Sequence, residues 1–212
     1  PVKMVRRPSV PQGRKRRLED GEEERLLAAC DRGRTPLLKQ LVILAVETGM
    51  RRGELLGLRW EHVHHAKRIV HLPVTKNGES RDVPLSRRAT DTLTALSKQK
   101  QPGAELVFPM SGNSVRLAFK RLRARAKMPD FHFHDLRHEA ITRLFERGLN
   151  IAEVSAISGQ QRTADAAALH ASAGDRSCWS IGLIVSPEGS KSGTNSGRPI
   201  RWSLCRALFL NS

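Results

Sequence analysis

The 212-residue sequence contains no tyrosine, and aromatic residues make up only 4% of it. Acidic residues are also scarce, because 21 Asp and Glu stand against 37 Lys and Arg, which gives a net charge of +16. This balance excludes an acidic disordered protein and predicts a polyanionic partner, most often a nucleic acid. Proteins that bind membrane surfaces share this balance, so charge alone does not identify the partner.

Long hydrophobic runs and a cysteine pattern are missing as well. No stretch of 18 apolar residues occurs, so we expect no membrane-spanning helix, and the first 30 residues contain no signal-peptide core. The three cysteines form neither a disulfide framework nor a metal motif, which favours a reducing cytoplasm. Four histidines lie between residues 62 and 71, but they lack metal-site spacing, so we expect no metal.

Changes of pattern divide the chain into three parts. Residues 1–17 form a basic arm in which several prolines disfavour regular structure. Residues 18–160 show regular hydrophobic patterns and are expected to form one domain. Residues 161–212 are rich in Ser, Gly and Arg and show no amphipathic period, so we expect them to be disordered or translated out of frame. The chain starts with Pro1, and we expect it to be a fragment of a longer protein.

Hydrophobic periodicity predicts an α-rich mixed α+β domain with a small antiparallel sheet. Residues 68–72 and 81–85 are typical of short strands, and Lys76-Asn77-Gly78 between them signals a hairpin. Asp20 is placed to cap a first helix ahead of three glutamates. Further helices are predicted over residues 37–46, 53–58, 86–98, 115–127, 135–147 and 151–157.

Two basic clusters, one in the arm and one on the helix at 115–127, are candidates for contact with a nucleic-acid backbone. Within each cluster, cations follow one another without an intervening acid. Such a cluster either lies on an ordinary solvated face or neutralises phosphates. The phosphate-contact candidates are Arg14, Lys15, Arg16, Arg17, Arg116, Lys120 and Arg123.

The segment TGMRRGELLGLRW contains an arginine at a helix–helix turn. Gly49 is placed to end one helix, so Arg51 lies on the tight turn that opens the next. A guanidinium there, assisted by the helix N-terminus, is suited to hold a phosphate, and Glu54 is placed to orient it. An ordinary joint with surface arginines is the alternative interpretation.

Two further segments add groups that move protons or bind anions. Lys76 lies at the expected hairpin tip, where a lysine is either merely solvated or acts as a general acid toward a leaving oxygen. His134 and Arg137 are three residues apart and therefore share one helical face. Together they are suited to bind one phosphate and move one proton, whereas a core histidine is the alternative.

In this order, TGMRRGELLGLRW, VTKNGESRDVPL and HDLRHEAITRLFERG followed by EVSAISG resemble the tyrosine recombinase (phage integrase) family. The resemblance covers about residues 18–160 and implies a helical catalytic domain of bacterial or phage origin that breaks and rejoins duplex DNA. It implies that Arg51 and Arg137 hold the scissile phosphate, Lys76 protonates the leaving 5′ oxygen and His134 is an acid/base. It also implies a second clamp domain, a tetrameric synapse on DNA, and no ATP, metal or other cofactor.

The sequence departs from the family at the nucleophile. The family has a histidine and then a tyrosine where this chain has Gln160 and Leu169. Without a tyrosine the covalent step cannot occur, so we expect a cleavage-inactive copy, monomeric in isolation. The alternative is a non-enzymatic DNA-binding protein that uses the same basic surface.

A one-base insertion near codon 160 accounts for this departure. Codons that the genetic code allows for residues 160–174, read with one G removed, translate as His-Ser-Ala-Pro-Arg-Met-Leu-Gln-Arg-Tyr-Thr-His-Leu-Arg. That frame places histidine at position 160 and tyrosine at position 169. The hypothesis predicts a tyrosine codon there in the shifted frame of the coding DNA.

Overall fold

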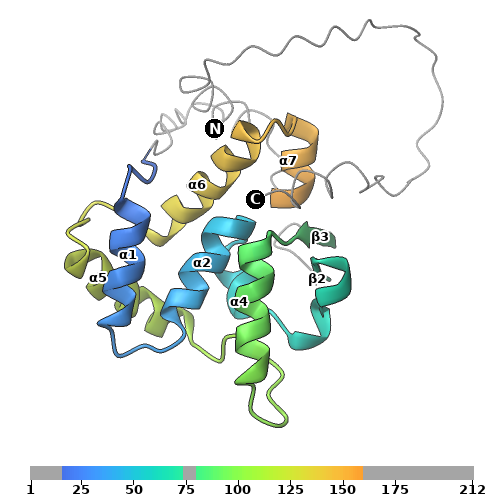
Figure 1. The fold of residues 1–212 in the computed structure, drawn as a ribbon, viewed down its shortest axis with the longest axis horizontal. Helices are drawn as coiled ribbons and strands as arrows, with labels where there is room; N and C mark the ends of the chain where they lie inside the picture. Colours follow the sequence, from blue (N-terminus) through green and yellow to red (C-terminus); the bar gives the residue numbers. More distant parts are fainter. Residues whose placement is uncertain (1–15, 74–79, 160–212) are drawn as a thin grey trace, which may run out of the picture.

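The computed structural model describes residues 16–73 and 80–159, which form a helical domain with one small sheet (Figure 1). This confirms the predicted fold class. The chain order is α1 (Glu22–Asp31), α2 (Leu38–Thr48), α3 (Arg52–Leu56), β1 (Val63–His64), β2 (Ile69–Leu72), β3 (Arg81–Pro84), α4 (Arg87–Lys98), α5 (Gly112–Arg125), α6 (Phe133–Glu146) and α7 (Ile151–Ser158).

Helix α2 is the centre of the core. Its sequence LKQLVILAVET is apolar on most sides, so the helix must be surrounded by other elements. It packs against α6, α4 and α1 (Figure 1). The helix ends as predicted at Gly49, whose left-handed φ of 62° lets its amide donate to the Ala45 carbonyl at 3.1 Å. This ending turns the chain directly into α3.

The sheet has the antiparallel order β1-β2-β3. Val70 in β2 lies opposite Val63 in β1 and Val83 in β3, and these valines face the core. The two predicted strands are confirmed, whereas the two-residue β1 is too short to leave a pattern in the sequence. The hairpin tip with Lys76 lies outside the described residues. Helix α7 packs beside β3 and so joins the sheet to α6.

Two helix starts differ from the prediction because of local backbone chemistry. Asp20 does not cap α1; the residue before the helix is Gly21, with a φ of 75°. Helix α5 starts earlier than predicted, at Gly112, because the Ser111 hydroxyl accepts a hydrogen bond from the Ser114 amide at 3.1 Å. No helix within the described ranges is long and apolar enough to cross a membrane.

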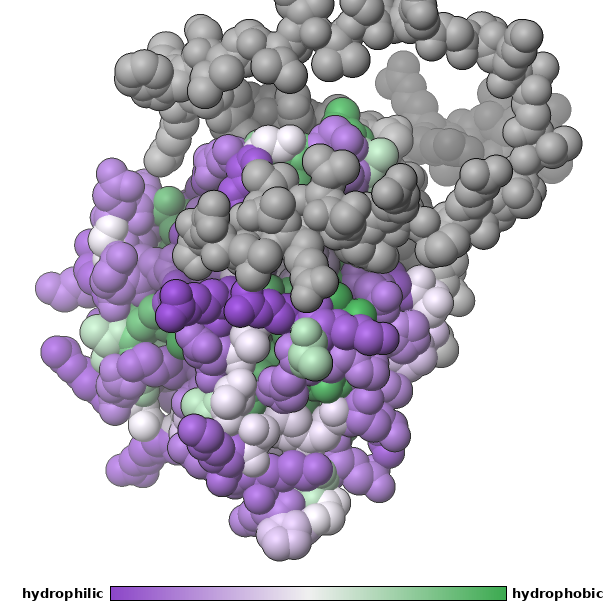
Figure 2. Space-filling view, turned by 45° about the vertical axis from the view of Figure 1, so that its right-hand side comes forward, coloured by the Kyte–Doolittle hydropathy of each residue, from purple (hydrophilic) through white to green (hydrophobic). Residues whose placement is uncertain are grey.

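The surface of the described part is mainly polar. Figure 2 shows one face on which hydrophilic residues prevail and hydrophobic residues form small separate patches. Leu117 on α5 is a large hydrophobic side chain that is exposed, at 38%. Apolar side chains are instead buried in the core around α2, and this burial is the main contribution to the stability of the fold.

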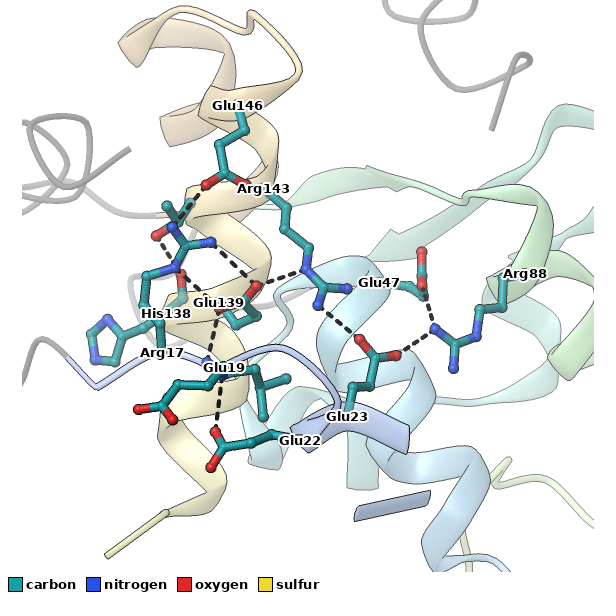
Figure 3. Close-up of polar contacts among 12 residues, drawn as sticks. Arg17, Glu19, Glu22, Glu23, Glu47, Arg88, His138, Glu139, Arg143 and Glu146 are labelled. Atoms are coloured by element: carbon teal, nitrogen blue, oxygen red, sulfur yellow. Dashed lines mark hydrogen bonds and ion pairs between the residues drawn. The ribbon is translucent and has the colours of Figure 1, made fainter. Parts of the chain in front are cut away.

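A buried carboxylate on α6 binds the segment that precedes α1 (Figure 3). Glu139 is 3% exposed and accepts hydrogen bonds from Arg17 Nε at 3.1 Å, the Leu18 amide at 3.2 Å and Arg143 Nε at 2.8 Å. Burial raises the cost of its charge, but the hydrogen bonds from Arg17 and Arg143 outweigh that cost and lower its pKa.

The same ion-pair chain continues across the molecule. Arg143 Nη2 donates to Glu23 on α1 at 2.7 Å, and Arg88 at the start of α4 donates to the other oxygen of Glu23 at 2.5 Å (Figure 3). Arg88 also reaches Glu47 on α2 at 3.3 Å, and Glu47 accepts from the Ser86 hydroxyl at 2.7 Å. Charged side chains thus connect α6, α1, α4 and α2.

Candidate phosphate-binding site

A cleft of about 840 Å³ opens where α3, the end of β2 and the start of α6 meet. Its lining includes Arg51, His134 and Arg137, three of the residues that the sequence analysis selected for catalysis. They come from positions up to 86 residues apart in the chain. Arg52 and Arg59 line the same cleft, so its wall is rich in cations. A cationic cleft of this kind attracts anions.

Arg51 is held at the start of α3 by Glu54. Its amide donates to Glu54 Oε2 at 2.7 Å, and its Nη1 donates to Glu54 Oε1 at 2.8 Å. Nη2 donates to the Gly159 carbonyl at 2.8 Å. The side chain is 25% exposed, and a guanidinium has more donors than these bonds use. Arg51 is therefore oriented by the protein and retains donors for an anion in the cleft.

Arg137 is a buried cation at the inner end of the cleft. The residue is only 6% exposed, and its guanidinium donates to the carbonyls of Gly49 and Ser158, the latter at 2.8 Å. Within the described residues, no carboxylate pairs with it. Burial, followed by repulsion from Arg51, lowers its pKa to about 10, so it stays charged at pH 7. A buried cation without an anionic partner favours a bound anion.

His134 lies one helical turn before Arg137 on α6 and also lines the cleft. Its ring meets that of His138 edge to face, with centroids 4.8 Å apart. The pKa of His134 is lowered by partial burial first, and then by the nearby His138 and the positive Arg137. The neutral imidazole is thus favoured near pH 7, and a neutral ring is able to accept a proton.

Sequence reasoning missed Arg81, which binds the same carboxylate of Glu54 as Arg51 does. Its guanidinium donates to Glu54 Oε1 at 3.0 Å and Oε2 at 2.7 Å, and its Nε donates to the Ile157 carbonyl at 2.9 Å. Its side chain is only 8% exposed. Nothing in the strand pattern around residue 81 signals a partner 27 residues earlier.

The two arginines at the end of the basic arm form ion pairs within the domain. Arg16 is 18% exposed and pairs with Glu22 at 2.7 Å and Asp130 at 2.9 Å. Arg17 is 15% exposed and pairs with Glu139. Both guanidinium groups are engaged in ion pairs within the domain, and their contact with phosphates stays a prediction. Glu22 lies six residues after Arg16, whereas Asp130 and Glu139 lie 114 and 122 residues further along the chain than their arginine partners.

The other predicted residues lie away from the cleft or outside the described ranges. On α5, Arg116 and Lys120 are exposed, and Arg116 donates to Asn113 at 2.9 Å. Arg123 is half-buried and donates to the Phe131 carbonyl at 3.3 Å. Outside the described residues lie Arg14, Lys15, Lys76, Gln160 and Leu169.

Comparisons with known proteins agree on one family and one fold. The model of the phage integrase family matches residues 16–168. A shufflon-specific DNA recombinase of Escherichia coli is 46% identical over 162 residues, which cover 76% of this chain and 41% of that protein. The chain therefore spans less than half the length of this relative.

Solved structures share the fold. The Tn1549 transposon integrase in complex with transposon right end DNA matches with a TM-score of 0.63 at 19% identity, over 77% of this chain and 63% of that one. The catalytic domain of bacteriophage HP1 integrase matches with a TM-score of 0.58 at 24% identity, over 74% of this chain and 87% of that one.

Proposed function

The chain belongs to the phage integrase family, and on this premise we propose that it is the catalytic domain of a site-specific DNA recombinase that retains its phosphate site but lacks its nucleophile. Its partner is double-stranded DNA, and it derives from a recombinase of a mobile element or phage. It works in the cytoplasm, and it is monomeric alone, whereas the family assembles as a tetramer on DNA.

The buried cation Arg137 is the observation on which this proposal rests. It shares the cleft with Arg51, and both are oriented by protein carbonyls. Two oriented guanidinium groups match the non-bridging oxygens of one phosphodiester and stabilise the extra negative charge of a pentavalent transition state. This is why the site fits a backbone phosphate of DNA better than a neutral ligand.

Each remaining group has a role in the proposed reaction. In the family, a tyrosine oxygen attacks the phosphorus, a 3′-phosphotyrosyl bond forms, and the bond to the 5′ oxygen breaks. Lys76 would give the leaving 5′ oxygen its proton, and His134 would act as acid/base beside the phosphate. The phosphotyrosyl bond stores the energy for rejoining, so neither ATP nor a metal is consumed.

The nucleophile is the missing part. The 212 residues contain no tyrosine, and the family position is Leu169, after Gln160 at the position of the second histidine. The one-base insertion proposed near codon 160 restores both residues. In its present form the chain binds DNA but does not cleave it.

Restoring the reading frame tests the proposal. One base is deleted at codon 160, and the product is incubated with a nicked suicide DNA substrate beside the present chain and a restored chain with a phenylalanine codon at position 169. Denaturing electrophoresis should show a covalent protein–DNA adduct only for the restored tyrosine form. An adduct from the present chain would contradict the claim that it lacks a nucleophile.

The absence of tyrosine also favours a second candidate, a DNA-binding protein without cleavage that occupies or regulates a site. The two functions differ in the restored chain: both predict binding of duplex DNA, but only the recombinase predicts an adduct. Arg51→Ala and Arg137→Ala should weaken binding under either function, because each removes a cation from the cleft. Unchanged binding by both variants would show that the phosphate site is misassigned.

A further inference from the structure

Three consecutive carbonyls at the end of α7 each accept a hydrogen bond from a different arginine. Arg81 Nε donates to Ile157, Arg137 Nη2 to Ser158 and Arg51 Nη2 to Gly159, at 2.9, 2.8 and 2.8 Å. The last carbonyls of a helix lack partners inside the helix and carry its negative dipole end, so cations there are favoured. Arg51 and Arg137 thus bind the same helix end as Arg81.

Arg81 also completes the surroundings of Glu54. Each oxygen of this carboxylate accepts one bond from Arg51 and one from Arg81, at 2.7–3.0 Å. Burial disfavours the charge of Glu54, but the bonds from Arg81 and from Arg51 outweigh this and lower its pKa. Arg51 and Glu54 alone would form a neutral pair. With Arg81 the group keeps one net positive charge, which is available to an anion in the cleft.

Gly159 permits this close approach. Its φ is +66°, and a Cβ there would lie 2.7 Å from Nη1 and 3.0 Å from Cζ of Arg81. Any other residue would strain the backbone and push against the buried guanidinium. The end of α7 and Arg81 are therefore fitted to each other.

We propose that Arg81 is a positioning residue of the phosphate site, which neutralises Glu54 and holds the end of α7 so that Arg51 and Arg137 face the cleft before DNA arrives. This inference rests on the proposed function, because it assumes that these two arginines bind phosphate. Arg81 does not line the cleft and acts through Glu54 and the α7 carbonyls.

The experiment titrates the full chain with inorganic phosphate and follows the arginine Nε–H resonances by NMR. The variants are Arg81→Gln, Arg81→Lys, Glu54→Gln and the double variant with glutamine at both positions. Arg143→Gln is the matched control, because Arg143 also pairs with carboxylates inside the domain and lies outside the cleft lining. Circular dichroism establishes that each variant is folded at the titration temperature, and the phosphate dissociation constant is fitted to the folded signals only.

Arg81→Gln should weaken phosphate binding about tenfold, since Glu54 then neutralises Arg51, whereas the control should change it less than about threefold. Arg81→Lys should fall between them, because an ammonium restores the charge but lacks the planar fork that reaches Glu54 and the Ile157 carbonyl together. The decisive result is rescue: the double variant should bind phosphate more tightly than Arg81→Gln. A merely structural role predicts the opposite, because a second loss of partners adds damage.

The outcomes separate the two claims. If phosphate shifts the Arg51 and Arg137 signals but Arg81→Gln binds it like the parent, or if the double variant binds no better, the positioning role is wrong and the proposed function stands. If phosphate leaves the parent's Arg51 and Arg137 signals unmoved, both the proposed function and this inference fall.

Discussion

At the scale of single residues, the shape of a side chain matters as much as its charge. Arg137 reaches the Gly49 and Ser158 carbonyls with two different nitrogens of one planar group. A lysine carries the same charge as a compact point and cannot span both carbonyls. The two carbonyls come from the end of α2 and the end of α7, so this one side chain joins the ends of these two helices.

Arg137→Lys should therefore lower the free energy of unfolding by roughly 1–3 kcal/mol, because a buried carbonyl loses its donor. The same substitution at the exposed Arg121 should change it by less than about 0.5 kcal/mol. Urea unfolding at pH 7 measures both. Equal stability of the Arg137→Lys chain and the parent would show that the two carbonyl bonds contribute nothing.

His134 provides a prediction about pH. Its pKa in the folded chain lies below the ordinary value of 6.5, so the unfolded chain binds a proton more readily. The free energy of unfolding should therefore fall as the pH drops below 6.5, and should recover as it rises. His134→Asn should show a smaller fall between pH 7.5 and pH 5.5, measured by urea unfolding. An NMR titration midpoint of His134 above 6.5 would contradict the lowered pKa of this residue.

The cleft residues that sequence reasoning selected lie at turns and helix starts, where local sequence patterns identify them. Arg51 follows a helix-ending glycine, and His134 and Arg137 share a helical face; such relations are visible within a few residues. Arg81 was missed because its partners, Glu54 and Ile157, lie 27 and 76 residues away. Pairing across such separations depends on the packing of β3 against α7, which no local pattern encodes.

At the scale of elements, the glycine that ends α2 sets the direction of α3. Gly49 has a φ of +62°, and an added Cβ would also meet Ala140 at 3.4 Å. Its carbonyl accepts the bond from Arg137, so its conformation serves both the helix end and the cleft. The prediction of this ending from the sequence succeeded because a C-terminal glycine has a local backbone cause.

Gly49→Ala should cost about 1–2 kcal/mol of unfolding free energy, the penalty of a side chain in the left-handed region. Gly53→Ala is the matched control: a Cβ there meets nothing within 4 Å, and its position in α3 favours alanine, so stability should stay equal or rise slightly. Thermal unfolding compares the two variants with the parent. A Gly49→Ala chain as stable as the Gly53→Ala chain would exclude conformational strain at the helix end.

Element boundaries were harder to predict than element types. The strands and the helices with a broad apolar face were predicted from the sequence because the spacing of their apolar residues matches the face that the fold buries. The starts of α1 and α5 were misplaced because single hydrogen bonds and a left-handed glycine decide them. The ion pairs of Arg16 with Asp130 and of Arg17 with Glu139 were not predicted for a different reason: the partners lie 114 and 122 residues apart in the chain.

At the scale of the whole molecule, charge has two separate uses. The net charge of +16 provides long-range attraction for a polyanion, whereas several buried or half-buried acids form ion pairs inside the domain, namely Glu22, Glu23, Glu54 and Glu139. Glu139 and Glu23 link the segment before α1 to α6, α1 and α4 (Figure 3). These carboxylates hold cations inside the domain, whereas Arg137 in the cleft pairs with no carboxylate among the described residues.

Glu139→Gln tests this internal network. Removing one charge of a buried group leaves Arg17 and Arg143 partly unpaired, so we expect a loss of about 3 kcal/mol at pH 7. Glu61→Gln, which breaks an exposed pair with Arg59, should cost less than about 1 kcal/mol.

Because the pKa of Glu139 is lowered in the folded chain, its stabilisation is complete above the ordinary value of 4.5 and is lost as the pH falls through the folded pKa. The difference in unfolding free energy between parent and Glu139→Gln should accordingly stay constant from pH 7 to about pH 5 and shrink below pH 4.5, as measured by urea unfolding across that range. A difference that stays constant down to pH 3 would show that the carboxylate charge does not hold these elements together.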